Sequence, residues 1–116
     1  MAIAARAHHA AHNPPMSAAF HDNPTAARFE ATVDGQVAAF AAYNVLQHGL
    51  LFTHTEVQPQ FEGQGLGSQL AKFALDSVRE RGVQAIPVCQ FIAGYIRRHP
   101  EYLDLVPEES RRAFKV

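Results

Sequence analysis

Residues 57–68 read VQPQFEGQGLGS, and this stretch decides the fold of the chain. An apolar run ends at its first residue, and a pattern typical of an amphipathic helix begins at Leu66 and continues to Arg81. Gly82 ends that helix, and Val83–Val88 reads as a further strand. A strand, a glycine turn, a helix and a strand form one βαβ unit, so we expect the two strands to be parallel.

The segments before the glycine turn predict three antiparallel strands. Arg28–Val33 alternates polar and apolar residues, as a half-buried strand does. The dipeptide Asp34-Gly35 is a strong hairpin signal, and Gln36–Val45 after it is apolar on both sides, which predicts a central strand. A turn at residues 47–49 leads to a third strand over Leu50–Val57. The sequence therefore predicts an α+β (α/β) fold: a mixed, mostly antiparallel sheet with one βαβ unit.

A proline constrains the last predicted strand. Pro87 has no N–H to donate, so this strand lies at an edge of the sheet or is parted from its partner there. A gap between parallel strands at their carboxyl ends is a natural ligand crevice. A second helix is predicted to begin at Cys89 or Gln90 and to end before Pro100.

The composition excludes several classes of function. The chain has 116 residues, 47% of them hydrophobic, and a net charge of -1, which predicts one folded domain without the basic excess of nucleic-acid or membrane-surface binders. No apolar run approaches the roughly 20 residues that span a bilayer. A single cysteine forms no internal disulfide, so we expect a reducing compartment, the cytoplasm. We expect a monomer or a weak homodimer.

The N-terminal segment differs in composition from the rest. Residues 1–24 are rich in alanine, histidine and proline and show no helical or strand period, so we expect a disordered tail before a domain over residues 25–116. The chain offers no ligand set with zinc-like spacing beside the histidines of this tail, and we predict no metal site. Those histidines are His8, His9, His12 and His21.

Gly63, Gly65 and Gly67 alternate between the predicted strand and helix. Glycine lets a backbone turn tightly and approach a ligand closely. The first N–H groups of a helix have no internal partner, and with the helix dipole they form an anion site suited to phosphate. The alternative is a simple tight turn, although three alternating glycines exceed what a turn needs. The run is no P-loop, because Gly-Lys-Ser/Thr is absent, and its spacing differs from the dinucleotide fingerprint.

Four short motifs in order resemble a known family. Residues 57–67, with Pro59-Gln60 before the glycines, are similar to the acetyl-CoA motif Q/R-x-x-G-x-G/A of the Gcn5-related N-acetyltransferase (GNAT) superfamily. Together with HTEV at 54–57, PVC at 87–89 and HPEY at 99–102, they resemble its minimal single-domain branch, the YjdJ-like or NATD1-like proteins. The resemblance covers roughly residues 28–106.

The resemblance implies a GNAT fold without its N-terminal helices, acetyl-CoA as cosubstrate and an amine acceptor. In that family the backbone N–H groups of the glycine turn bind the pyrophosphate, and the pantetheine arm lies between two splayed parallel strands. On this chain the resemblance assigns the pantetheine or thioester contact to Val57. It assigns pyrophosphate binding to Glu62, Gly63, Gln64, Gly65, Leu66, Gly67 and Ser68. Glu62 departs from the frequent basic residue, so only its N–H is expected to serve.

Candidate catalytic groups flank the glycine turn. Cys89 opens the second helix, where a helix N-terminus favours the nucleophilic thiolate, so it either forms an acyl-enzyme, lines the pocket or is an inert buried thiol. Glu56 and His54 share one side of the third strand because side chains alternate. An attacking amine must be neutral, so Glu56 first and His54 second are candidate bases, unless each merely faces solvent or a neighbouring strand. Superfamily members often use a tyrosine in the last helix as acid, but Tyr95 fits the core better.

The sequence therefore predicts an acetyltransferase that moves an acetyl group from acetyl-CoA to an amine, on a small molecule or a protein. Transfer is either direct or through an acetylated Cys89. The alternative function is a CoA-binding sensor or interaction module without catalysis, because the chain lacks the N-terminal helices that wall the acceptor pocket in larger relatives.

Overall fold

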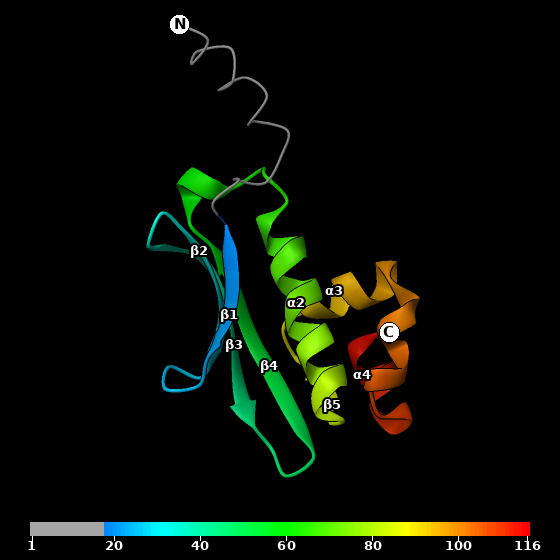
Figure 1. Cartoon of the computed structure of the whole chain (residues 1–116). Coiled ribbons are helices and arrows are strands. Elements are labelled where there is room, and N and C mark those ends of the chain that lie inside the picture. The colour runs from blue at the N-terminus through cyan, green and yellow to red at the C-terminus, as the bar shows by residue number, and fades with distance from the viewer. Residues whose placement is uncertain (1–17) are drawn as a thin grey trace, which may run out of the picture.

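The computed structural model describes residues 18–116, in which a five-stranded sheet lies on one side and the helices on the other (Figure 1). The strands are β1 (Ala19–Asn23), β2 (Arg28–Val33), β3 (Gln36–Val45), β4 (Gly49–Val57) and β5 (Gln84–Pro87). The α-helices are α2 (Leu66–Arg81), α3 (Gln90–Arg98) and α4 (Arg111–Phe114). Short 3₁₀ helices are η1 (Pro59–Phe61), η2 (Pro100–Leu105) and η3 (Glu108–Ser110).

The predicted topology is confirmed. The strand order in the sheet follows the chain from β1 to β5, with antiparallel pairing as far as β4 and parallel pairing between β4 and β5. The strand over Gln36–Val45 is the central one, as its apolar faces indicated. The helix predicted over Leu66–Arg81 has the same bounds in the structure. The fold class, a mixed and mostly antiparallel sheet with one βαβ unit, is therefore confirmed.

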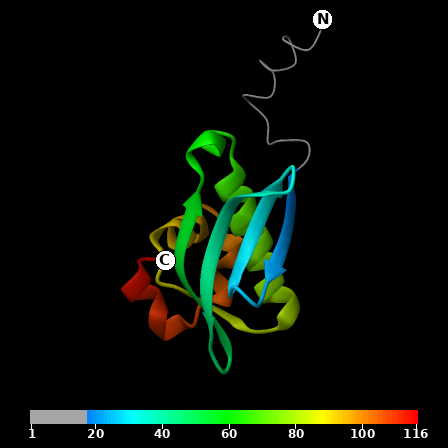
Figure 2. The same ribbon diagram turned by 90° about the vertical axis from the view of Figure 1, so that its left-hand side faces the viewer.

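Apolar side chains between the sheet and α2 form the core. Phe29 of β2 and Phe52 of β4 are fully buried, and their ring centroids lie 6.2 Å apart. Phe73 of α2 packs edge-on against Phe29 at 6.0 Å. Fully burying an apolar side chain of this size contributes about 1.5–3 kcal/mol. This packing fixes α2 across one face of the sheet, and Figure 2 looks onto the opposite face.

A β-bulge in β4 changes which side chains face α2. The pairing of β4 with β3 shifts between Phe52 and His54, so Thr53 is an extra residue. Strict alternation from the buried Phe52 would place His54 on the α2 side. Because Thr53 is an extra residue, His54 points away from α2, and Thr55 and Val57 point toward it. The bulge therefore selects the side chains that line the end of β4.

The parallel strands β4 and β5 part at Pro87. Their ladder ends with the pair of Phe52 and Pro87, after which β4 continues to Val57 while the chain turns into α3. β5 is an edge strand, as its proline predicted. The backbone N–H of Cys89 donates to the carbonyl of Phe52 over 2.8 Å and holds the turn against β4. A crevice at the carboxyl end of this strand pair is thereby bounded by β4 and by the start of α3.

The predicted tail is wrong in its last residues, because β1 is part of the sheet. Residues 19–23 pair along β2 from Ala19 with Thr32 to Asn23 with Arg28. The short, mixed sequence of β1 shows no clear period, and its pairing depends on partners that are distant in the chain. Residues 1–17, and with them His8, His9 and His12, lie outside the described residues.

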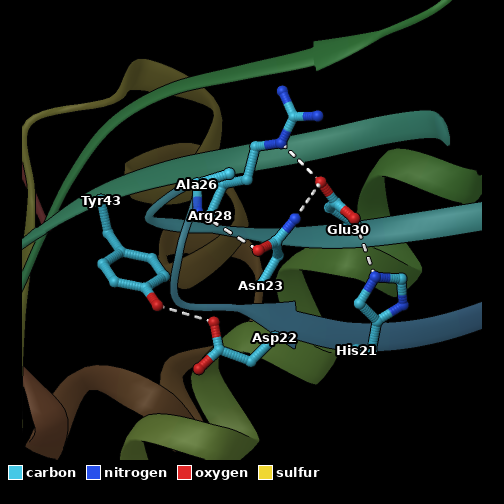
Figure 3. A network of polar contacts seen from close by, with 7 residues as sticks. All are labelled: His21, Asp22, Asn23, Ala26, Arg28, Glu30 and Tyr43. Carbon is cyan, nitrogen blue, oxygen red and sulfur yellow. Dashed lines mark hydrogen bonds and ion pairs between the residues drawn. The ribbon is translucent and has the colours of Figure 1, made fainter.

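A buried carboxylate joins β1 to β2 on the face away from α2 (Figure 3). Glu30 is 4% exposed and accepts hydrogen bonds from Arg28 Nε at 2.6 Å and Asn23 Nδ2 at 3.1 Å, and it lies 2.8 Å from His21 Nε2. Burial alone would raise the pKa of Glu30, but the hydrogen bonds from Arg28, His21 and Asn23 outweigh it and lower the pKa below 4.5. We call these four residues the Glu30 cluster.

A second polar contact attaches β1 to the α2 side of the sheet. The hydroxyl of Tyr43 donates to Asp22 over 2.6 Å, and the Arg81 guanidinium at the end of α2 pairs with the other Asp22 oxygen (Figure 3 shows the tyrosine and the aspartate). Burial and this hydrogen bond raise the pKa of Tyr43 to about 12. The phenol therefore stays a donor throughout the physiological range.

Candidate functional site

The glycine turn links η1 to α2 through two residues with left-handed backbones. Gly63 has φ 83° and Gly65, the N-cap of α2, has φ 76°. A Cβ added at either position would meet no atom within 4 Å, so the requirement for glycine is conformational rather than steric. The structure therefore explains two of the three alternating glycines by the turn itself.

The third glycine is required by close packing. A Cβ on Gly67 would lie 2.9 Å from Cζ of Phe91 and 3.3 Å from Cγ2 of Val57. Gly67 thus lets the first turn of α2 approach both the end of β4 and the start of α3. The three elements of the crevice meet at this position.

Backbone N–H groups point into the crevice from two directions. The first hydrogen bond within α2 runs from the Gln69 N–H to the Gly65 carbonyl over 3.1 Å. The N–H groups of residues 66–68 therefore have no acceptor within the helix. On β4, Gln58 N–H donates to Ala38 of β3 over 2.8 Å. Successive N–H groups of a strand alternate in direction, so that of Val57 points away from β3, to the side where the ladder with β5 has ended.

A cavity of about 340 Å³ occupies this place. Seven of the eight residues predicted to bind the cofactor line it, namely Val57, Glu62, Gly63, Gly65, Leu66, Gly67 and Ser68. Gln64 is not among the lining residues. Sequence reasoning missed Thr55, Phe61 and Phe91, which complete the lining. Alternation puts Thr55 on the same side of the strand as Val57, but the bulge at Thr53 decides that this side faces α2, and Phe91 reaches the cavity only through tertiary packing.

The charge of this cavity is unusual for a phosphate site. Among the described residues its lining includes one ionisable side chain, that of Glu62, and no lysine or arginine. Attraction of an anion must therefore come from the backbone N–H groups and the dipole of α2, which act at short range. Glu62 is exposed and opposes them.

Cys89 is not among the residues that line the cavity, but it contacts one of them, Thr55. The Cys89 thiol is buried, with 7% of the residue exposed, and Sγ lies 3.3 Å from Oγ1 of Thr55. The residue is the N-cap of α3 with an extended backbone. The structure thus places Cys89 beside the β4 residue that lines the cavity, where sequence reasoning expected the thioester.

His54 and Glu56 lie together, but on the other face of β4. Nε2 of His54 is 3.1 Å from Oε1 of Glu56, and the imidazole packs against Phe40 with ring centroids 5.9 Å apart. Both side chains are solvent-exposed. The shared side predicted for the pair is confirmed, whereas the cavity at Thr55 lies across the strand. Their catalytic role stays a prediction.

Tyr95 is a core residue, as the sequence suggested. It is 5% exposed, and its ring stacks on His99 at 4.1 Å and lies 6.0 Å from Tyr102. Tyr102 in turn donates to Asp76 of α2 over 2.7 Å. Tyr95 therefore packs α3 against η2, and it does not line the cavity at the glycine turn.

Residues 18–116 contain neither a group of metal ligands nor a membrane-spanning helix. In that part of the chain no three or more histidine, cysteine or acidic residues are grouped so that they could hold a metal ion. No helix there combines the length and the apolar character that crossing a bilayer requires.

Comparison with protein families gives a match that spans most of the described fold. A family model described as GCN5-related N-acetyl-transferase matches residues 28–105. The match runs from β2 through the glycine turn and Cys89 to η2, so it includes every residue of the crevice.

Curated relatives match a shorter stretch of the chain. The chain is 40% identical over 53 residues to Protein NATD1 of Xenopus tropicalis, which is 44% of this chain and 49% of the relative. The match to Protein NATD1 of Homo sapiens is likewise 40% over 53 residues and covers 44% and 47%. That of Danio rerio is 34% identical over 55 residues, with 46% and 50% covered. The aligned region therefore spans about half the length of these relatives.

Proposed function

The chain belongs to the GCN5-related N-acetyltransferase family, and from that premise we propose that it transfers an acetyl group from acetyl-CoA to an amine. The observation that carries the proposal is the convergence of amides on the cavity at the glycine turn. Residues 66–68 and Val57 present N–H groups from two elements, and the two positive-φ glycines hold the turn open. This donor set suits the pyrophosphate and thioester ends of one ligand.

The fit of the chain to CoA rests on those donors. The amides of the first turn of α2 would hold the pyrophosphate, and the Val57 N–H would bind the thioester carbonyl. The ladder of β4 and β5 ends at Pro87, and the cavity lined by Thr55, Val57 and Phe91 would take the extended arm. Glu62 is the one feature that opposes an anion, and its exposed side chain leaves its own N–H available.

The transfer itself requires modest help from the protein. The amine nitrogen forms a bond to the acetyl carbon, the bond from carbon to sulfur breaks, and the CoA thiolate leaves. The amine must lose one proton, and the thiolate gains one. Glu56 and His54 are the proposed proton acceptors, directly or through a water, because no other exposed histidine–carboxylate pair borders the end of β4 among residues 18–116.

The covalent variant places an acetyl group on Cys89. Its Sγ would attack the thioester with loss of the thiolate, and the amine would then take the acetyl group from sulfur. The contact with Thr55 gives the thiol a polar neighbour at the proposed thioester position. Cys89→Ala separates the routes: retention of most transfer activity excludes the acetyl-cysteine, whereas loss with unchanged CoA affinity supports it.

A non-catalytic CoA-binding module is the second candidate function. It is favoured by one observation: the predicted bases lie across β4 from the cavity. The discriminating experiment titrates CoA while amide signals are followed by NMR, and then assays acetyl transfer to a panel of amines. Shifts at residues 62–68 with turnover support the enzyme, and the same shifts without turnover support the module. Unmoved signals at residues 62–68 would refute both.

A further inference from the structure

A second cavity lies against another face of α3, which Gln90, Ala93 and Arg97 form, whereas Phe91 lines the cavity at the glycine turn. The second cavity encloses about 320 Å³ between α3 and residues 113–115, which we call the C-terminal segment. The two cavities share no lining residue. α3 presents the buried Ile92 and Ile96 to the core, whereas Ala93 and Arg97 face this second cavity. Pro87 and Val88 form its wall beside β5.

The ionisable groups that line this cavity are both positive. Arg97 and Lys115 line it, and no acidic side chain among the described residues does so. Nη1 of Arg97 donates to the carbonyls of Phe114 and Lys115 at 3.2 and 3.1 Å, which ties down the C-terminal segment. Within residues 18–116 neither cation forms an ion pair with a carboxylate. A concave surface with one sign of charge attracts counter-ions.

Lys115 lines the cavity at the point where α4 ends. Lys115 caps α4 with φ 60° and ψ 40°, the left-handed conformation that favours glycine or asparagine. A left-handed residue is common at the end of a helix, and here the Lys115 N–H donates to the carbonyls of Arg111 and Arg112. Because Arg97 already serves the backbone, Lys115 is the group best able to bind a ligand directly.

The position of this cavity relates it to the transfer reaction. Its wall includes Val88 and Gln90, the two neighbours of Cys89, while Thr55 on the opposite side lines the cavity at the glycine turn. A donor and an acceptor must reach one reacting centre from different directions. We propose that the cavity between α3 and the C-terminal segment is the acceptor pocket, and that it selects small amines that carry a carboxylate. This inference rests on the acetyl transfer proposed above.

Binding of a product-like pair tests the inference without turnover. The probes are N-acetyl-γ-aminobutyrate and its uncharged carboxamide, titrated into the full chain while NMR amide signals are recorded. We expect the carboxylate to shift signals at residues 88–97 and 113–115, and the carboxamide to bind at least fivefold more weakly. Equal affinity for the two probes, or shifts confined to other residues, would overturn the proposal.

Three variants assign the effect to the cavity. Lys115→Gln should weaken binding of the carboxylate at least threefold, and Lys115→Arg should retain it. Arg112 belongs to α4, which Lys115 caps, but it does not line the cavity, so Arg112→Gln should leave binding unchanged. An equal loss in Lys115→Gln and Arg112→Gln would indicate only net charge and refute the pocket. A CoA titration of each variant reports on residues 62–68, so failure of the acetyl-CoA site would be seen separately.

Discussion

The Glu30 cluster and the glycine turn are both polar regions of the sheet and its connections, yet they use their polar groups in opposite ways. In the Glu30 cluster a buried carboxylate is surrounded by three donors, and each oxygen is engaged. After the glycine turn, the N–H groups of residues 66–68 have no acceptor within the helix. The ionisable side chain beside them, Glu62, is negative and would repel an anion. The first arrangement holds β1 on the sheet, and the second leaves capacity for a ligand.

The difference teaches how to separate stability from binding in this fold. Hydrogen bonds that are complete in the folded chain stabilise it, and their loss is measured as unfolding free energy. Donors without partners in the protein contribute little until a ligand arrives. Substitutions in the two regions should therefore act on different measurements.

The largest expected effect is loss of stability on Glu30→Gln. The amide cannot replace a carboxylate that accepts from Arg28 and Asn23, and the neighbouring cation is left without its counter-charge. Hydrogen bonds to charged groups contribute about 1.5–3 kcal/mol, so we expect a loss of about 2–3 kcal/mol in urea unfolding. CoA affinity should not change. Glu56→Gln is the matched control on the same face of the sheet. Because the Glu56 carboxylate is half-exposed, this substitution should lower the unfolding free energy by less than about 0.5 kcal/mol.

Acid should remove the same contribution from the wild-type chain. Because the folded-state pKa of Glu30 lies below 4.5, its stabilisation is present above pH 4.5 and is lost as the pH falls through the folded pKa. The difference in unfolding free energy between wild type and Glu30→Gln should shrink as the pH is lowered from 6 to 3. A difference that stays constant over this range would mean that the Glu30 charge contributes nothing.

The glycine turn should respond in binding. Gly65→Ala forces an L-residue into φ 76°, at a cost of roughly 1–2 kcal/mol, and the turn can relieve that strain by moving its amides. We expect CoA affinity, measured by calorimetry, to fall about tenfold. Gly35→Ala is the matched control, with φ 78° in the hairpin between β2 and β3 and equally open space around a Cβ. A similar loss of affinity in both variants would contradict a specific role for the turn.

The smallest expected effect is a gain. Glu62→Gln removes the one negative charge from the lining of the cavity, and CoA should then bind about two- to fivefold more tightly at low salt. The gain should fade at high ionic strength because the side chain is exposed to solvent. Glu80→Gln, near the other end of α2, should leave the affinity unchanged. Weaker binding in Glu62→Gln would show that the carboxylate assists the site.

Local patterns predicted the elements that carry the site. Alternation and helical spacing are properties of neighbouring residues, and they gave β2, β3, β4 and α2 with little error. Pro87 predicted both the edge position of β5 and the end of its ladder, since the missing N–H acts at that residue alone. β1 was missed because its place depends on contacts with Glu30 and Tyr43, which are formed only in the folded chain.

By itself, then, the sequence determined the unit of strand, glycine turn and helix and the free N–H groups where the helix begins. A turn, a helix start and the missing N–H of a proline each depend on the residues at that point of the chain. Tertiary structure alone decided which side chains meet there. The extra residue at Thr53 turned Thr55 to the cavity and His54 to the opposite face, and packing of α3 on Gly67 brought Phe91 across the crevice. Bulges and contacts between distant elements depend on how strands pair and helices dock, and no local period encodes them.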